Sequence, residues 1–214
     1  MRKVILFQGD SITDCGRGQN CKDGNLGHGY ATVVSGNLGA QSVGEYTFYN
    51  RGISGNRIVD VYARIKRDII NLKPDYMSIL IGINDVWHEY GEQNGVATEK
   101  FERIYNMLIE EIKEALPNIK IMILEPFVLE GSATENTEEH PARFEYFVNG
   151  ANEKRAAVKR VAEKNGLTFV PLFDVFNAAD KENKGVWSGD GVHPSALGHG
   201  LIATEWLKAF NKIK

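Results

Sequence analysis

The strongest constraint on the fold is the alternation of short apolar runs with longer segments of helical periodicity. Five runs are rich in β-branched and aromatic residues, and they cover residues 4–7, 46–49, 76–81, 119–124 and 167–170. Apolar runs of this kind are typical of strands buried on both faces of a parallel sheet. The sequence therefore predicts an α/β fold, a three-layer α/β/α sandwich with a five-stranded parallel sheet. We expect the flavodoxin-like strand order 2-1-3-4-5.

Helical patterns lie between and after these runs. In residues 58–72, for example, Ile58, Val61 and Ile65 recur at steps of three and four residues, and Pro74 follows. Gly166 is a plausible stop for a long helix, and Ser195 is a plausible N-cap for the last one. We predict helices over residues 30–38, 58–72, 101–112, 143–164, 173–179 and 195–210, and loops over 12–27, 50–56, 127–142 and 184–194. A chain of 214 residues is compatible with a single domain over residues 1–214.

Composition narrows the function classes. The formal net charge is −3 and no basic stripe is present, so the sequence shows no electrostatic footprint for nucleic acid. No apolar run approaches the length of a membrane span. The apolar run near the N-terminus is shorter than the core of a secretory signal, which favours a cytoplasmic location. We therefore expect neither nucleic acid nor a membrane as partner.

Cys15 and Cys21 are the two cysteines of the chain. Two thiols cannot form a structural zinc site alone, and the nearby His28 is a weak third ligand, so we expect no metal. Free thiols are expected in a cytoplasmic protein. A disulfide within the loop and a cysteine nucleophile are the alternatives.

Residues with catalytic potential follow the predicted strands. Ser11 follows the first strand, Gly55 the second and Asn84 the third, while Asp190 and His193 come after the fifth strand and its short helix. The carboxyl ends of parallel strands meet at one edge of a sheet, where open α/β proteins bind their ligands. We therefore expect these residues to lie together.

The five residue types suit acyl transfer. A serine hydroxyl is a weak nucleophile that needs a base, which His193 can supply. Asp190 can hold the imidazole, and the Ser11 N–H, the Gly55 N–H and the Asn84 side chain can stabilise an oxyanion. Each feature also has a structural interpretation, since Asp-x-x-His arises by chance and glycines serve loop geometry. Their joint placement at separate strand ends favours catalysis.

Four motifs carry a resemblance to a known family. They are GDSIT from Gly9, GISGN from Gly52, GIND from Gly82 and DGVHP from Asp190. In order and spacing they resemble the four sequence blocks of the SGNH (GDSL) hydrolases and span nearly the whole chain.

This resemblance implies a flavodoxin-like sandwich without cofactor or metal. It implies that Ser11 is the nucleophile and that Asp190 and His193 complete the catalytic triad. It also implies that Gly55 and Asn84 complete the oxyanion hole with the Ser11 N–H.

The segments at 10–17, 27–30, 81–87 and 126–127 are more closely similar to the intracellular acetylxylan esterases of this family, which are carbohydrate acetylesterases. The similarity implies removal of acetyl groups from a sugar such as an acetylated xylo-oligosaccharide. It also implies a homo-oligomer, since relatives are often oligomeric. Residues 186–189 depart from the pattern, which leaves the acceptor sugar open.

Aromatic and basic residues beside these motifs are candidates for sugar binding. Trp87 and Trp187 adjoin the third and fourth motifs, and aromatic faces suit the apolar faces of sugar rings. Tyr30, Arg57 and Arg17 are predicted to line the same mouth. Core packing is the alternative for each tryptophan.

Two other functions are compatible with the sequence. One is a thioesterase, lysophospholipase or short-chain lipase that uses the same triad. The absence of a hydrophobic lid argues against an interfacial lipase. The other is a non-catalytic carbohydrate-binding protein on an esterase scaffold, which the presence of all five catalytic residue types disfavours.

Overall fold

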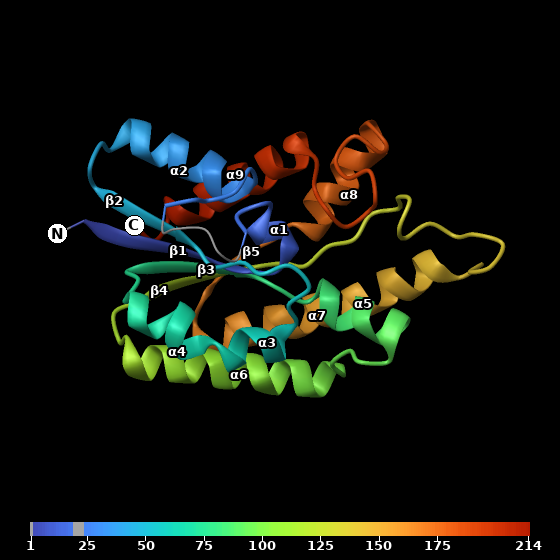
Figure 1. The fold of residues 1–214 in the computed structure, drawn as a ribbon, viewed down its shortest axis with the longest axis horizontal. Coiled ribbons are helices and arrows are strands. Elements are labelled where there is room, and N and C mark those ends of the chain that lie inside the picture. Colours follow the sequence, from blue (N-terminus) through green and yellow to red (C-terminus); the bar gives the residue numbers. More distant parts are fainter. Residues whose placement is uncertain (1, 19–23) are drawn as a thin grey trace.

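The sheet confirms the predicted architecture. A computed structural model describes residues 2–18 and 24–214 (Figure 1). Its parallel sheet has the order β2-β1-β3-β4-β5, as predicted. The strands are β1 (Lys3–Gly9), β2 (Tyr46–Asn50), β3 (Tyr76–Leu80), β4 (Lys120–Leu124) and β5 (Thr168–Val170).

Helices cover both faces of the sheet. Among the described residues they are α1 (Ser11–Asp14), α2 (Tyr30–Gln41), α3 (Ile58–Ala63), α4 (Ile65–Asp68), the 3-10 helix η1 (Ile70–Leu72), α5 (Ile83–Glu92), α6 (Thr98–Ala115), α7 (Arg143–Asn165), α8 (Phe173–Glu182) and α9 (Ala196–Phe210). Figure 1 shows α1, α2, α8 and α9 on one side of the sheet and α3 to α7 on the other. The chain therefore forms the predicted three layers.

Side chains along β1 point alternately to the two faces of the sheet, and each face packs against one helical layer. Ile5 and Phe7 pack with Tyr30 on the side of α2, whereas Leu6 packs with Ile58 on the opposite side. All of these side chains are fully buried. A strand buried on both faces has no polar side, which is why this stretch is a continuous apolar run.

Three helical regions differ from the prediction. The helix predicted over 58–72 is divided into α3, α4 and η1, and Arg64 lies at the first break with non-helical φ and ψ of −113° and 16°. The segments of α1 and α5 were not predicted as helices. α1 is too short for periodicity to reveal it. Smaller differences occur at helix ends, since α2 continues past Gly39 to Gln41.

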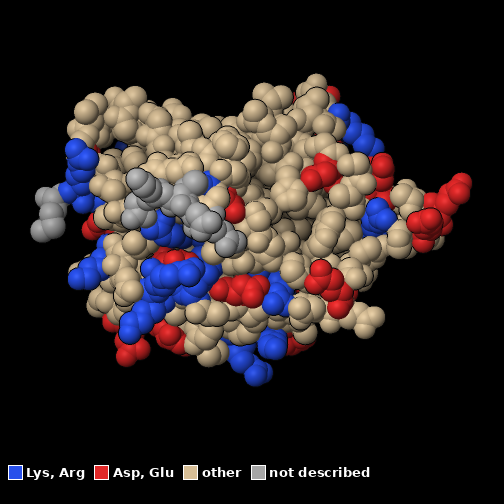
Figure 2. Space-filling view, in the orientation of Figure 1, with Lys and Arg blue, Asp and Glu red and all other residues tan. Residues whose placement is uncertain are grey.

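Charged side chains are distributed unevenly over the two helical layers. Over α4 and α6, Figure 2 shows Lys and Arg side chains next to Asp and Glu side chains, whereas the half over α2 and α9 shows few charges.

Over residues 2–18 and 24–214, no helix is long and apolar enough to cross a membrane. Cys15 is a free thiol. Cys21 lies outside the described residues, so the structure does not test the predicted alternatives for the two cysteines.

Candidate active site

Ser11 stands at the turn from β1 into α1. Asp10 is the N-cap of α1, and its Oδ1 accepts a hydrogen bond from the Ile12 N–H at 3.0 Å. The Asp14 N–H donates to the Asp10 carbonyl at 2.8 Å, which closes the first turn of the helix. These short-range bonds keep Ser11 at the carboxyl end of β1, at the edge of the sheet where ligands bind in open α/β proteins.

Ser11, His193 and Asp190 form a chain of contacts across 182 residues of sequence. Ser11 Oγ lies 2.8 Å from His193 Nε2, and His193 Nδ1 lies 2.7 Å from Asp190 Oδ2. When Asp190 accepts the Nδ1–H, Nε2 is left to accept the serine proton. The predicted trio is therefore brought together in an arrangement that suits nucleophilic catalysis.

Backbone bonds fix the orientation of Asp190. Its Oδ1 accepts the N–H groups of Val192 at 2.9 Å and of His193 at 2.7 Å. Partial burial alone would raise the pKa of Asp190, but hydrogen bonds from His193 and these N–H groups lower it below its usual value. Asp190 is therefore an ionised acceptor at neutral pH.

Ser188 is a contact of Asp190 that sequence reasoning missed. Its Oγ lies 3.1 Å from Asp190 Oδ1 and 2.8 Å from the His193 carbonyl oxygen, and the residue is buried. The only sequence signal was its place in the 186–189 segment, which departs from the family pattern. The single hydroxyl proton of Ser188 can go to either acceptor, so this residue braces the turn that carries Asp190 and His193.

Two backbone N–H groups and one amide are the donors predicted to stabilise an oxyanion. The N–H groups of Ser11 and Gly55 donate to no acceptor within the described part of the chain. Gly55 has a φ of +81°, and open space surrounds the position that a Cβ would occupy. Asn84, in the first turn of α5, donates one Nδ2 hydrogen to the Asn56 carbonyl at 3.1 Å and keeps a second. Donors of this kind suit an oxyanion.

Two buried carboxyl groups flank these donors. Burial raises the pKa of Asp10 to about 7, although the Ile12 N–H and nearby His193 lower it. Burial likewise raises the pKa of Asp85 to about 8, against the Ile58 N–H and the charge of Lys154. Asp85 ties α5 to α3, since its two oxygens lie 3.2 Å and 3.3 Å from the Ile58 nitrogen.

Tyr30 does not fit the substrate-binding role predicted for it. The side chain is fully buried, and its hydroxyl lies 3.0 Å from Thr13 Oγ1. Its ring packs edge-on against Phe7 with a centroid distance of 5.7 Å. An apolar ring buried in the core at the start of α2 has no surface to offer a sugar, and single-sequence reasoning could not detect that burial.

Arg57 and Arg17, the basic residues predicted to bind substrate, form hydrogen bonds within the protein. Arg57 donates through Nε to Asp60 Oδ2 at 3.0 Å and through Nη1 to the Asn94 carbonyl at 2.5 Å. Arg17 is buried, and its Nη2 donates to the Gly52 carbonyl at 2.7 Å. Both side chains therefore hold loops in place, and Arg17 has no exposed face for a ligand.

The two tryptophans predicted to bind sugar, Trp87 and Trp187, are half-buried. Trp87 stacks on Phe147 with a centroid distance of 4.7 Å, which is the core packing considered as its alternative. Trp187 packs against the core on the α2 side and precedes Ser188 in the loop that carries Asp190 and His193. Its indole Nε1 is buried and has no hydrogen-bond partner within residues 2–18 and 24–214. Sugar binding by either residue stays a prediction.

His199 contacts Cys15 and the start of α2. His199 Nδ1 accepts the Tyr30 N–H at 3.1 Å, and its Nε2 lies 3.2 Å from Cys15 Sγ. Burial raises the pKa of Cys15, which disfavours the thiolate that a cysteine nucleophile requires. Within the described residues, no cluster of three or more His, Cys, Asp or Glu side chains could hold a metal ion.

A cavity of about 700 Å³ lies elsewhere, between α5, the start of α6 and α7. Its walls include Glu89, Thr98, Asn149 and Lys154, and none of Ser11, Asp190 and His193 lines it. The contact chain through Ser11 is the candidate active site, and the cavity adjoins its surroundings at Asp85, next to Asn84.

Comparisons with known proteins agree with this geometry. The GDSL-like Lipase/Acylhydrolase family matches residues 7–201. An acetylxylan esterase from Geobacillus stearothermophilus is 36% identical, over 95% of this chain and 92% of its own. A protein from Parabacteroides merdae described as a GDSL-like lipase has a similar structure, with a TM-score of 0.89 and 36% identity over 99% of this chain and 97% of its own.

Solved structures of Axe2, an acetylxylan esterase from Geobacillus stearothermophilus, are also similar to this chain. A variant of this acetyl-xylooligosaccharide esterase has a TM-score of 0.82 and 34% identity, covering 97% of this chain and 93% of its own. Two further Axe2 structures are of catalytic mutants, with alanine in place of a serine and of a histidine. The match along most of the chain and the similarity of these structures show that the protein belongs to the GDSL-like lipase/acylhydrolase family and is a carboxylic ester hydrolase.

Proposed function

We propose that Ser11, His193 and Asp190 are the catalytic triad of this esterase, and that the Ser11 N–H, the Gly55 N–H and Asn84 form its oxyanion hole. The observation that carries the proposal is the unbroken contact chain from Ser11 Oγ through the imidazole to Asp190. The two catalytic mutants of Axe2, which replace a serine and a histidine, support the same chemistry.

The proposed reaction passes through an acyl-enzyme. His193 Nε2 takes the hydroxyl proton as Ser11 Oγ attacks the ester carbonyl, and Asp190 stabilises the imidazolium. Gly55 and Asn84 donate to the tetrahedral oxyanion with the Ser11 N–H. His193 then protonates the leaving alcohol oxygen, and the C–O bond of the ester breaks. Water, deprotonated by His193, attacks the acyl-enzyme and releases the acid and the free Ser11 hydroxyl.

We propose acetylated xylo-oligosaccharides as the substrate class. Axe2, an acetyl-xylooligosaccharide esterase, shares the fold over nearly the whole chain. Trp187 lies in the loop that carries Asp190 and His193, and aromatic rings suit the apolar faces of sugar rings. The 186–189 segment, where the sequence departs from the family pattern, is the part of the site that we expect to select the sugar.

The test is acetate release from acetylated xylo-oligosaccharides, measured beside hydrolysis of p-nitrophenyl acetate. The wild-type enzyme is expected to release acetate from the sugar, and Ser11→Ala, checked for folding by circular dichroism, is expected to lose both activities. Activity on the aryl ester alone would refute the sugar proposal and retain the triad. Near-normal activity in folded Ser11→Ala would refute the triad.

Acyl chain length separates this proposal from a thioesterase or lipase activity on the same triad. We expect p-nitrophenyl acetate to be hydrolysed faster than the octanoyl ester, and the reverse order would favour the longer-chain functions. A cytoplasmic location and a homo-oligomeric state stay predictions, which cell fractionation and sedimentation velocity would check.

A further inference from the structure

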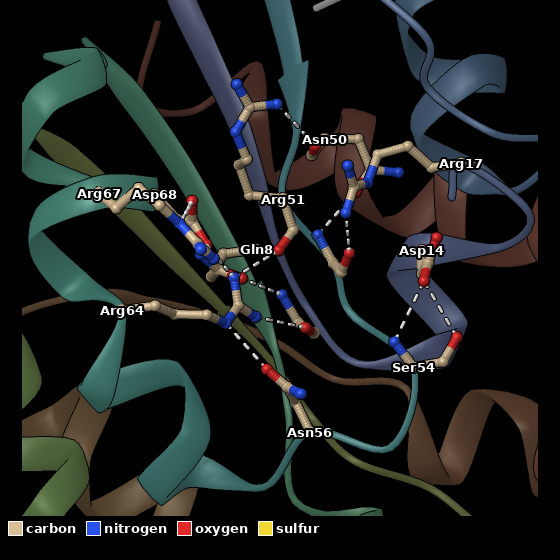
Figure 3. Close-up of polar contacts among 12 residues, drawn as sticks. Gln8, Asp14, Arg17, Asn50, Arg51, Ser54, Asn56, Arg64, Arg67 and Asp68 are labelled. Atoms are coloured by element: carbon tan, nitrogen blue, oxygen red, sulfur yellow. Dashed lines mark hydrogen bonds and ion pairs between the residues drawn. The ribbon is translucent and has the colours of Figure 1, made fainter. Parts of the chain in front are cut away.

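The segment that carries Gly55, residues 51–57, is held by side chains from neighbouring elements (Figure 3). Asp14 Oδ2 accepts the Ser54 N–H at 3.1 Å and the Ser54 hydroxyl at 3.0 Å. Asn50 Oδ1 accepts the Gly52 N–H at 2.9 Å. A loop with this many bonds to fixed elements can hold a backbone N–H in one place.

Arg64 is the side chain that joins this segment to the end of β1. It lies at the break between α3 and α4, and only 9% of its side chain is exposed. Its Nε donates to Asn56 Oδ1 at 2.8 Å, and its Nη2 donates to the Gly9 carbonyl at 3.2 Å. Its Nη1 donates to the Arg51 carbonyl at 2.7 Å and to Asp68 Oδ2 at 2.9 Å. One guanidinium therefore connects the nucleophile strand, the Gly55 segment and α4, as Figure 3 shows.

Asn56 links this guanidinium to two of the three donors of the proposed oxyanion hole, Gly55 and Asn84. Its side chain accepts from Arg64, and its carbonyl accepts from Asn84 Nδ2 at 3.1 Å. Gly55, with its free N–H, is the preceding residue. At the other end of the guanidinium, Gly9 lies two residues before Ser11. A shift of the Arg64 side chain would therefore change the positions of all three proposed oxyanion donors.

We propose that Arg64 is a positioning residue, which sets the place of the Gly55 N–H and the Asn84 amide relative to Ser11. This inference rests on the proposed function, because it takes those groups to be the oxyanion donors. Arg64 has no direct role in bond making. Its planar fork presents donors in fixed directions, which an ammonium on a flexible stem cannot reproduce.

Asp68 supplies the countercharge that allows Arg64 to be buried. Burial alone would raise the pKa of Asp68, but hydrogen bonds from Arg67 and Arg64 lower it. Arg67 binds the same carboxylate, at 2.8 Å through both Nε and Nη2, yet 71% of its side chain is exposed. In the described part of the chain Arg67 donates to Asp68 alone, so it offers a matched control with the same partner and no contact to the Gly55 segment.

The test compares Arg64→Met, Arg64→Lys, Asn56→Ala and Arg67→Met in the hydrolysis of p-nitrophenyl acetate, below the melting temperature of each variant. Arg64→Met should lower kcat about 100-fold, the loss expected from roughly 1 Å of misplacement. KM should change by less than about twofold, because the oxyanion donors act mainly in the transition state. Arg64→Lys should recover stability through its pairing with Asp68 but not recover kcat.

The remaining variants guard against a purely structural explanation. Asn56→Ala leaves the Arg64–Asp68 pair intact and should lower kcat by a smaller factor, with no added loss when combined with Arg64→Met. Arg67→Met should keep the wild-type kcat. If the Arg64 variants do not fold, Asn56→Ala decides the outcome, and a wild-type kcat there overturns the proposal.

Other outcomes also overturn the inference. They are a wild-type kcat in folded Arg64→Met, full recovery of kcat by Arg64→Lys, or an equal loss in Arg67→Met. These results would leave the triad untouched, because the wild-type enzyme would still be active and Ser11→Ala inactive. A wild-type enzyme without esterase activity would instead overturn the proposed triad and this inference together.

Discussion

Asp190 binds His193 through both of its carboxylate oxygens, one to the imidazole Nδ1 and one to the backbone N–H. The imidazole is half-exposed, so its orientation depends on these bonds more than on packing. At the scale of single residues, the site thus relies on a carboxylate that stays ionised, and the lowered pKa of Asp190 has that effect.

We expect Asp190→Asn to lower kcat for p-nitrophenyl acetate about 10⁴-fold with the fold intact, because an amide that donates to Nδ1 selects the wrong imidazole tautomer. Steady-state kinetics with a circular dichroism spectrum checks this. The matched control is Asp174→Asn, which alters a carboxylate that is 80% exposed and pairs with Arg155 rather than with His193, and it should keep wild-type kcat. A loss below tenfold in Asp190→Asn would contradict the assigned role.

His199 should make stability depend on pH. Burial, with the charges of His193 and His28, lowers the pKa of His199 to about 4 from a usual value of 6.5. Between these pH values the unfolded chain binds a proton that the folded protein does not, so the free energy of unfolding falls as pH falls through this window. Between pH 7 and pH 5 we expect a loss of roughly 2 kcal/mol from this group.

Urea unfolding of the wild type and of His199→Gln at both pH values checks this prediction. The glutamine keeps an acceptor for the Tyr30 N–H and removes the titrating group. The wild type should lose stability relative to His199→Gln on acidification, and parallel pH profiles for the two proteins would rule the effect out.

At the scale of elements, the site depends on how closely the Gly55 segment approaches α1. A Cβ on Gly52 would lie 2.4 Å from the Asp14 nitrogen and 2.8 Å from the Thr13 carbonyl carbon. Both are backbone atoms, so neither can move aside as a flexible side chain could. Gly52 therefore allows the Gly55 segment to contact α1, which begins at Ser11.

Gly52→Ala should lower both stability and kcat, since the segment must move away from α1. Forced overpacking of this kind costs typically about 1–3 kcal/mol. Gly36→Ala is the control, because nothing lies within 4 Å of its Cβ position on α2, and it should raise stability by about 0.5–1 kcal/mol. Thermal melts and p-nitrophenyl acetate kinetics measure both, and a neutral Gly52→Ala would show that the contact is dispensable.

At the scale of the whole molecule, the sheet places its most buried strands at the centre. β1 lies between β2 and β3, and every residue of β3 is buried, whereas most of β2 is half-buried at the sheet edge. The residues of the proposed site are attached to the ends of this rigid centre. Stability is expected to decrease from the centre to the edges.

Amide hydrogen exchange should therefore be slowest in β1 and β3, faster in β2, and fastest in the loop over residues 127–142. Mass spectrometry of peptides from each segment checks this order. Protection of β2 equal to that of β3 would contradict it.

The sequence alone predicted the strands of the sheet and the catalytic residue types that follow the strand ends. These are local properties, since a buried strand must be apolar along its length and a catalytic group must be of a specific chemical type. The apolar run before Ser11 and the Asp-x-x-His spacing of Asp190 and His193 are both legible in short windows. The long helix ending before Gly166 and the capping by Ser195 were predicted for the same reason.

Only the tertiary structure decided the features that depend on residues distant in sequence. Tyr30 is buried because α2 packs on β1, and α3 and α4 are separated at Arg64, whose side chain bonds residues as far away as Gly9. Periodicity could not reveal that break, because apolar residues keep their helical spacing through it. Ser188 meets Asp190 only within a folded turn. Hydrogen bonds and burial are set by contacts in space, and those contacts exist only after the chain has folded.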